Sequence, residues 1–87
     1  MKIDHLGIAV RSLEESIGFY RDVLGLTVSG THRVDDQGVT VAMLPVGDTR
    51  VELLEPFSEE TVVGRFIGKR GEGLHHICYE VEDLHSK

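Results

Sequence analysis

Two nine-residue stretches decide the fold: HLGIAVRSL at residues 5–13 and HICYEVEDL at residues 76–84. They align without gaps at an offset of 71 residues, and both begin with histidine and share a valine and a leucine further on. In each stretch the side chains alternate as in a strand, and Ser12 or Asp83 follows at the position of a helix cap. The sequence therefore predicts an internal repeat, whose second copy begins near Leu74.

The residues between the two copies predict one β-α-β-β-β unit and one further helix. The first strand is expected over residues 3–10. A helix follows, with Ser12 and Glu15 as a capping box and Gly25 at its end. Three more strands are predicted, at residues 26–34, 39–45 and 50–55. The further helix is expected to have Ser58 as its N-cap, Glu59 and Glu60 in its first turn, and Gly71 at its end.

We divide the chain into three parts within one domain, since 87 residues rarely form more than one. Residues 1–57 are the first unit, residues 58–73 the linking helix, and residues 74–87 the first strand and the helix start of an incomplete second unit. Roughly 40 more residues would complete that second unit, judging by the length of the first. We therefore expect the natural chain to continue past Lys87 or to pair with another copy as a homodimer.

Composition and charge exclude several classes of protein. The net charge of −6 argues against a nucleic-acid partner, which selects basic surfaces. No apolar run approaches a membrane span and no signal segment begins the chain, so we expect a cytoplasmic protein with no membrane partner. The single cysteine, Cys78, rules out an internal disulfide and a cysteine-based zinc site.

Metal-binding residue types gather on one face of the predicted sheet. On each strand, the more regular apolar row is expected to pack on the helices, which leaves His5, Glu52 and His76 on the other face, where Gly7 leaves room. Two imidazoles and a carboxylate on rigid strands suit a divalent first-row metal. The same alternation turns His75 away, so we predict His76 as the ligand. Taken singly, each residue reads as a structural histidine or a solvated charge. The agreement of three strands with the repeat favours a site.

Four motifs carry a resemblance to a known family. They are DHLGIAV at residues 4–10 with FY at 19–20 and LG at 24–25, then LPVGDTRVELLEP at 44–56 and KRGEGLHHI at 69–77. The opening motifs resemble the vicinal-oxygen-chelate superfamily, which has the glyoxalase-like fold. The two later motifs resemble the methylmalonyl-CoA epimerase family within it, and the likeness spans essentially the whole chain.

The resemblance implies an α+β fold of paired β-α-β-β-β modules around a metal-centred cleft. It also implies interconversion of the C2 epimers of methylmalonyl-CoA in propionate metabolism, by proton abstraction and return through a metal-stabilised enolate. The family's ligands fall on His5, Glu52 and His76. Cobalt is the metal that we expect first, with nickel, manganese, zinc or magnesium as alternatives. The family's fourth ligand, a glutamate late in the second module, has no counterpart in these residues. The acid/base residues stay unassigned, because the nearby strand residue Val41 is apolar.

Other functions remain open. Another metal enzyme of the same fold, a glyoxalase I-like lyase or a ring-cleaving dioxygenase, is disfavoured by the epimerase-like second half of the sequence. A non-catalytic module that binds a small ligand would also explain an incomplete set of ligands. For the epimerase reading, we expect an acyl-CoA thioester as the small-molecule partner and a divalent metal as the cofactor.

Overall fold

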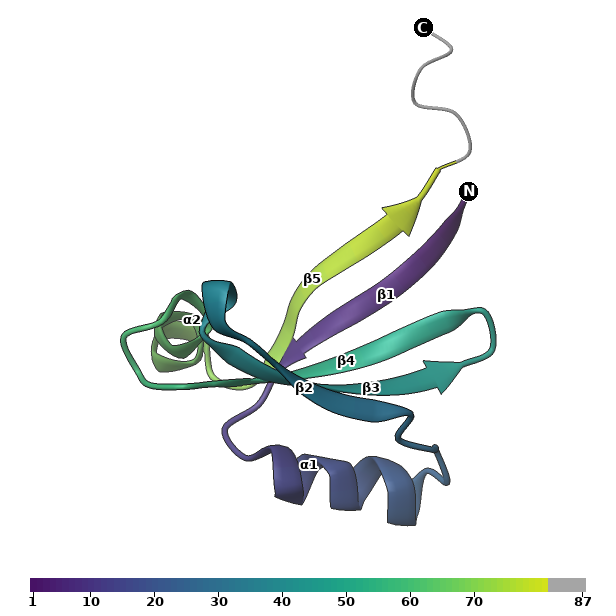
Figure 1. The fold of residues 1–87 in the computed structure, drawn as a ribbon, viewed down its shortest axis with the longest axis horizontal. Coiled ribbons are helices and arrows are strands. Elements are labelled where there is room, and N and C mark those ends of the chain that lie inside the picture. The colour runs from purple at the N-terminus through teal and green to yellow at the C-terminus, as the bar shows by residue number, and fades with distance from the viewer. Residues whose placement is uncertain (82–87) are drawn as a thin grey trace, which may run out of the picture.

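The computed structural model describes residues 1–81, which form a five-stranded mixed sheet with one helix on each side (Figure 1). The strands are β1 (Lys2–Ala9), β2 (Gly30–Val34), β3 (Val39–Val46), β4 (Thr49–Pro56) and β5 (Gly73–Glu80). The helices are α1 (Leu13–Gly18), which continues as a π-helical turn over Phe19–Val23, and α2 (Val62–Arg70). A 3-10 turn, Asp35–Gln37, joins β2 to β3. This order confirms the predicted α+β class, a β-α-β-β-β unit followed by a helix.

The sheet places the two copies of the repeat next to each other. Its strand order is β2-β3-β4-β1-β5, with β1 parallel to β4 and antiparallel to β5. The edge strand β5, for which the sequence offers no local partner, pairs with β1 along its whole length (Figure 1). The predicted cap at Asp83 and the helix start after it lie outside the described residues.

Helix α1 covers one face of the sheet and begins where the sequence predicts. The Ser12 hydroxyl accepts a hydrogen bond from the backbone N–H of Glu15 at 3.2 Å, which satisfies one of the free donors of the first turn. Beneath α1 lies a core that includes Leu44 and Leu53, both fully buried. Leu26 and Val28 pack against this core instead of extending the sheet, so β2 begins at Gly30 and is shorter than predicted.

Helix α2 begins later than predicted, because its N-cap is Thr61 and not Ser58. The Thr61 hydroxyl accepts the N–H of Gly64 at 3.0 Å and donates to the Ser58 carbonyl at 3.0 Å. Residues 58–61 therefore form a turn that leads into the helix. A side chain on Gly64 would collide with the Ser58 carbonyl, so the missing side chain permits this turn. Gly71 ends the helix, as predicted.

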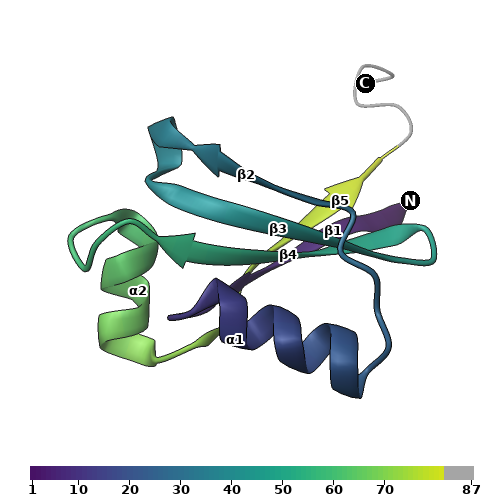
Figure 2. The ribbon, with the colours of Figure 1, turned by 60° about the horizontal axis from the view of Figure 1, so that its bottom comes forward.

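Helix α2 lies at one end of the strands (Figure 2). Its core contacts are with the sheet face opposite the one that α1 covers. The prediction that both helices cover the more regular apolar row is therefore wrong. The reason lies in the second row, which turns apolar at Ala9 and Leu54, and α2 buries these residues with Val63 and Ile67. The rest of this face, which we call the site face, is left uncovered by α2. Within residues 1–81, neither helix has the length and apolar character needed to cross a membrane.

Candidate metal site

Two β-bulges interrupt the pairing of β1 with β5. Ile3 pairs with Tyr79 and His5 with Cys78, so that Asp4 is skipped on β1. Further along, Gly7 pairs with His76 and Ile8 with Leu74, so that His75 is skipped on β5. A bulge adds one unpaired residue and redirects the side chains beside it. Asp4 and His75 occupy equivalent positions of the repeat, and each directly precedes a histidine.

The bulge on β5 brings His75 to the site face, so the prediction that His75 points away from His76 is wrong. Its Nδ1 lies 3.0 Å from Nδ1 of His76, and its ring meets the edge of Phe66 on α2 at 4.9 Å between centroids. Strict alternation holds only for a strand without extra residues. The sequence pattern gives no sign of where such an insertion falls.

The imidazoles of His5 and His76, which we call the imidazole pair, face each other across β1 and β5. Their Nε2 atoms lie 3.2 Å apart, and their rings are perpendicular with centroids 5.2 Å apart. Gly7 makes this arrangement possible, because it pairs directly with His76 and a Cβ on Gly7 would overlap the His76 ring.

Replacing Gly7 with alanine is expected to separate metal binding from folding. The added methyl group would push the His76 ring aside, and a side chain can rotate at little cost to the fold. We expect cobalt affinity to fall at least about tenfold, as when the support of a ligand is lost, while the urea midpoint changes little. Calorimetric titration and urea unfolding measure the two effects. Unchanged cobalt affinity in a folded variant would contradict this use of Gly7.

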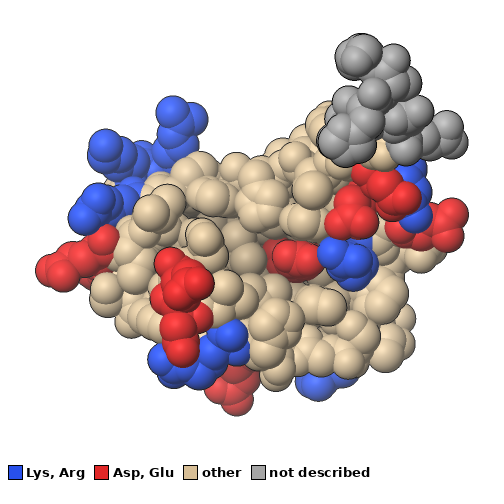
Figure 3. Space-filling model, turned by 45° about the horizontal axis from the view of Figure 1, so that its top comes forward, with Lys and Arg blue, Asp and Glu red and all other residues tan. Residues whose placement is uncertain are grey.

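Two carboxylates and one guanidinium lie beside the imidazole pair. Arg50 Nη2 donates to Asp4 Oδ2 at 3.0 Å and to Glu52 Oε2 at 3.2 Å. Glu52 Oε2 lies 3.8 Å from Nδ1 of His5, and Glu52 pairs with Gly7 in the register of β4 with β1. Figure 3, which looks onto this face, shows acidic and basic side chains side by side in its hollowed middle. Two carboxylates against one guanidinium leave a formal charge of −1, which favours a cation.

Sequence reasoning missed Asp4 and Arg50 as neighbours of the imidazole pair. Asp4 Oδ2 accepts a hydrogen bond from Nδ1 of His5 at 2.8 Å, which alternation along β1 does not predict. Alternation along β4 places Arg50 on the face of Glu52, and the parallel register of β4 with β1 pairs Arg50 with His5. Its Nε is buried and has no hydrogen-bond partner among residues 1–81, while its Nη2 serves both carboxylates.

The surroundings set the charge of two groups in the site. The hydrogen bond from His5 lowers the pKa of Asp4, and the charge of Arg50 lowers it further, so Asp4 is a carboxylate that only accepts. Burial lowers the pKa of His76, and the neighbouring His5 and His75 lower it further. His76 is therefore neutral at pH 7, which is the form that binds a metal.

The geometry of the imidazole pair fits a single divalent ion. Two nitrogens that bind one metal at about 2.0–2.1 Å lie about 3.0–3.4 Å apart in octahedral or tetrahedral coordination, and the pair lies 3.2 Å apart. Asp4 accepts a hydrogen bond from Nδ1 of His5, the ring nitrogen that would not bind the metal, as carboxylates commonly do for metal-bound histidines. Glu52 offers an oxygen on the same face. The structure thus brings His5 and His76 together at their Nε2 atoms, whereas Glu52 lies beside the other nitrogen of His5 and, among residues 1–81, does not join the two histidines as a group of donors within 4.8 Å.

A second group of donors shares His5. One ligand atom each of Asp4, His5 and Cys78 lie within 4.8 Å of one another, although the sequence assigned no metal role to Asp4 or Cys78. Asp4 already holds Nδ1 of His5, so this group competes with that hydrogen bond. The imidazole pair, by contrast, presents two Nε2 atoms toward each other, and it is the better candidate for a metal centre.

Acid is expected to destabilise the fold through His76. Its pKa in the folded chain lies below the ordinary value of 6.5, so the unfolded chain binds more protons as the pH falls through that value. Stability is then unaffected by His76 above pH 7 and decreases progressively below about pH 6.5. Urea unfolding with a chelator at pH 7.5 and pH 5.5 measures the loss. A His76→Gln variant should show a smaller loss, and an equal loss would assign the effect to other groups.

Comparison with known proteins extends this picture. The sequence profile of the Glyoxalase/Bleomycin resistance protein/Dioxygenase superfamily matches residues 4–87. The chain is 41% identical over 78 residues to the uncharacterized protein YqjC of Bacillus subtilis, covering 90% of this chain and 56% of that protein. It is 40% identical over 84 residues to the ethylmalonyl-CoA/methylmalonyl-CoA epimerase of Cereibacter sphaeroides, covering 95% of this chain and 63% of that enzyme.

Solved structures agree with the sequence comparison. A variant of Streptomyces coelicolor methylmalonyl-CoA epimerase, in complex with 2-nitronate-propionyl-CoA, superimposes with a TM-score of 0.87 at 39% identity. The match covers 97% of this chain and 64% of the enzyme, so the chain spans less than two thirds of each of these relatives. The fold family that the sequence motifs resemble is thereby confirmed, and so is the similarity to methylmalonyl-CoA epimerases. The chain belongs to the glyoxalase/bleomycin resistance protein/dioxygenase superfamily.

Proposed function

We propose that this protein interconverts the C2 epimers of methylmalonyl-CoA, with a divalent metal held by His5, Glu52 and His76. The observation that carries the proposal is the imidazole pair, whose Nε2 atoms lie 3.2 Å apart on rigid strands. The relatives named as epimerases support the choice of substrate, since one of them is seen with an acyl-CoA analogue. Cobalt is the metal that we propose first.

The residues of the site face suit the removal of a proton next to a thioester. A bound divalent metal would supply Lewis-acid stabilisation of the charge that develops on the thioester oxygen. His5 and His76 are held on neighbouring strands and Glu52 on the next, so their positions depend little on loops. Gly7 has no side chain, so the His76 ring can lie directly over the backbone of β1. The guanidinium of Arg50 adds positive charge beside the carboxylates, on the face where an anionic substrate would lie.

Deuterium exchange tests the proposed reaction directly. The protein is incubated with cobalt and one epimer of methylmalonyl-CoA in deuterated buffer. We expect deuterium at C2 and appearance of the other epimer, both lost on His5→Ala or His76→Ala substitution. A His32→Ala variant is the matched control, because His32 is exposed on β2. A folded, cobalt-loaded protein that incorporates no deuterium would remove the epimerase proposal.

A module that binds an acyl-CoA without turning it over is the second candidate. It is favoured by the position of Glu52, which lies beside Nδ1 of His5 and, among residues 1–81, does not join His5 and His76 as a group of donors within 4.8 Å. In the same experiment this candidate predicts saturable binding of the thioester without exchange at C2. The alternatives within the superfamily, a glyoxalase I-like lyase and a dioxygenase, are tested with their own substrates.

The homodimer and the three-part division of the domain stay predictions. Support for association comes from β5, an edge strand whose outer edge has no partner within residues 1–81. Leu74, Ile77 and Tyr79 of this strand are 52%, 39% and 56% exposed, and exposed apolar side chains on an unpaired strand favour association. Light scattering on the 87-residue chain measures the outcome, and a monodisperse monomer would contradict the dimer.

A further inference from the structure

Four side chains on the site face form an unbroken series of polar contacts. Asp4 Oδ2 lies 2.8 Å from Nδ1 of His5, and Nε2 of His5 lies 3.2 Å from Nε2 of His76. Nδ1 of His76 in turn lies 3.0 Å from Nδ1 of His75. Each ring nitrogen of His5 and His76 therefore has one neighbour within hydrogen-bond distance.

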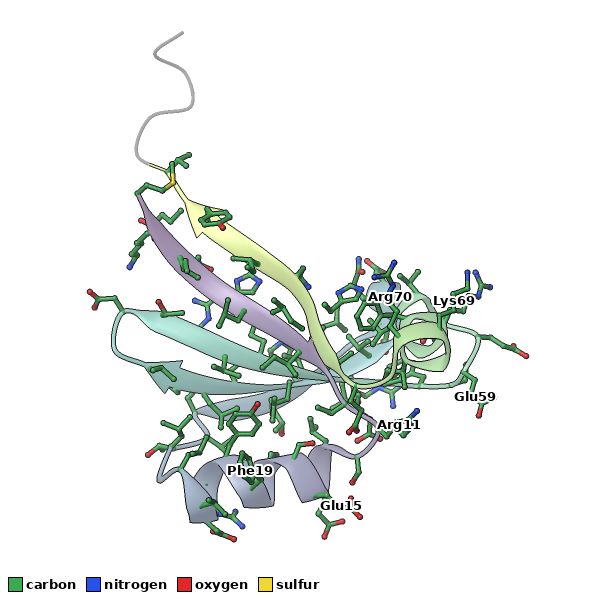
Figure 4. All side chains as sticks on the ribbon, turned by 180° about the vertical axis from the view of Figure 1, so that it is seen from behind. Arg11, Glu15, Phe19, Glu59, Lys69 and Arg70 are labelled. Carbon is green, nitrogen blue, oxygen red and sulfur yellow. The ribbon has the colours of Figure 1, made fainter. Side chains whose placement is uncertain are left out.

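The two ends of this series are equivalent in the repeat. Asp4 precedes His5 and His75 precedes His76, and both are the extra residues of β-bulges. Each bulge turns its extra residue toward the histidine that follows, so that Asp4 contacts Nδ1 of His5 and His75 contacts Nδ1 of His76. The Nε2 atoms of His5 and His76 are then free to face each other. Figure 4 shows Lys69 and Arg70 at the last turn of α2 and Arg11 just beyond the end of β1.

We propose that Asp4 and His75 are paired positioning residues, one for each imidazole, and that His75 changes tautomer when a metal binds between His5 and His76. The change of tautomer at His75 rests on the proposed metal site. The positioning of the two imidazoles by Asp4 and His75 rests on the contacts alone and holds for the protein without metal.

The Asp4 carboxylate, at one end of the series, decides which ring nitrogens of the three histidines carry a proton. An ionised carboxylate can only accept, so Nδ1 of His5 carries a proton and Nε2 of His5 does not. For the contact of 3.2 Å to be a hydrogen bond, Nε2 of neutral His76 must donate, and Nδ1 of His76 then accepts from Nδ1 of His75. Asp4 therefore determines the tautomers of all three histidines.

A metal between the two Nε2 atoms would need the opposite tautomer at His76. The proton on Nε2 of His76 must move to Nδ1, and the proton on Nδ1 of His75 must move to Nε2, by exchange with water. No proton is gained or lost in total, because each imidazole stays neutral. His75 then accepts from His76, as a carboxylate or carbonyl commonly does for a metal-bound histidine.

Long-range proton–nitrogen NMR on protein with 15N-labelled histidine tests the series without metal. With a chelator at pH 7.5, we expect His5 and His75 as Nδ1–H tautomers and His76 as the Nε2–H tautomer. The Nδ1–H form is the minor one of free histidine, so two such signals would be distinctive. If His75 instead shows the Nε2–H form without metal, the hydrogen-bonded series is wrong.

Zinc, which gives sharp NMR lines, tests the switch, and cobalt titration tests the consequence for affinity. On saturation with zinc we expect His76 to become Nδ1–H and His75 to become Nε2–H. His75→Ala should lower cobalt affinity about 10- to 100-fold, the usual cost of losing such a partner. His75→Gln, whose amide oxygen can accept, should recover part of the loss. In the same way, Asp4→Ala should lower cobalt affinity and Asp4→Asn, whose amide oxygen can accept, should recover part of the loss. His32→Ala should bind cobalt as the parent does.

The outcomes separate this inference from the proposed function. If the parent protein binds no metal but shows the expected tautomers, the metal site is overturned, the switch falls with it, and the positioning contacts stand. If the parent binds metal while His75→Ala binds it equally well and keeps the His76 tautomer, the inference is overturned and the metal site stands. Circular dichroism on each variant identifies any loss that comes from misfolding.

Discussion

Replacing either member of the imidazole pair with alanine is expected to cost more metal affinity than any other single change on the site face. His5→Ala or His76→Ala removes one of two nitrogens that lie 3.2 Å apart. Loss of a supporting residue costs about 10- to 100-fold, and loss of a ligand should exceed that. Titration with cobalt or nickel at pH 7.5 measures the affinity, and the visible absorption of cobalt reports the change in coordination.

Two controls bring out the specificity of this effect. His32→Ala removes an exposed imidazole from β2 and should leave affinity unchanged. Cys78→Ser removes the thiol of the group formed by Asp4, His5 and Cys78, and it should also have little effect if the metal lies between the two Nε2 atoms. A large loss on Cys78→Ser, with little loss on His76→Ala, would move the site to that second group.

Truncating Leu53 is expected to have the largest effect on stability. Leu53 is fully buried on β4, the central strand of the sheet, in the core beneath α1. Leucine-to-alanine changes in such positions cost about 2–5 kcal/mol, because apolar contacts are lost and the cavity closes only in part. Small domains have only about 5–15 kcal/mol in total, so Leu53→Ala should remove a large share of it. The shift of the urea midpoint measures this loss.

A matched control uses a residue of the same chemistry on the surface. Val62 begins α2 and is 67% exposed, so Val62→Ala should change the free energy of unfolding by no more than about 0.5 kcal/mol. If the two variants unfold at the same urea concentration, the core beneath α1 is not what stabilises the fold.

Local signals were sufficient for most of the secondary structure. The hydroxyl of Ser12 and the glycine at position 71 act on neighbouring backbone groups, so the sequence alone locates the start of α1 and the end of α2. Ser58 and Thr61 are both suitable caps, and only the close approach of Gly64 to the Ser58 carbonyl selects Thr61. The choice between the two caps therefore depended on how the backbone folds over residues 58–64, which neither cap residue shows by itself.

The candidate site shows the same division. Alternation along three strands, together with the repeat, was enough to name His5, Glu52 and His76, because side chains two residues apart share a face. Their metal role stays a proposal. The same alternation puts Arg50 on the face of Glu52, but its place beside His5 comes from the parallel pairing of β4 with β1. Asp4 and His75 were not predictable in this way, since both are bulged residues.

By itself, the sequence determined the kind of protein this is: a β-α-β-β-β unit, a further helix and a second copy of the first strand, with a histidine at the same position in both copies. These features rest on interactions within a few residues and on the period of a strand. Only the tertiary structure decided that the two copies pair antiparallel, that two bulges interrupt the pairing, and that Asp4 and His75 reach the imidazole pair. A bulge is decided by how two strands align, and that alignment is a property of neither strand alone.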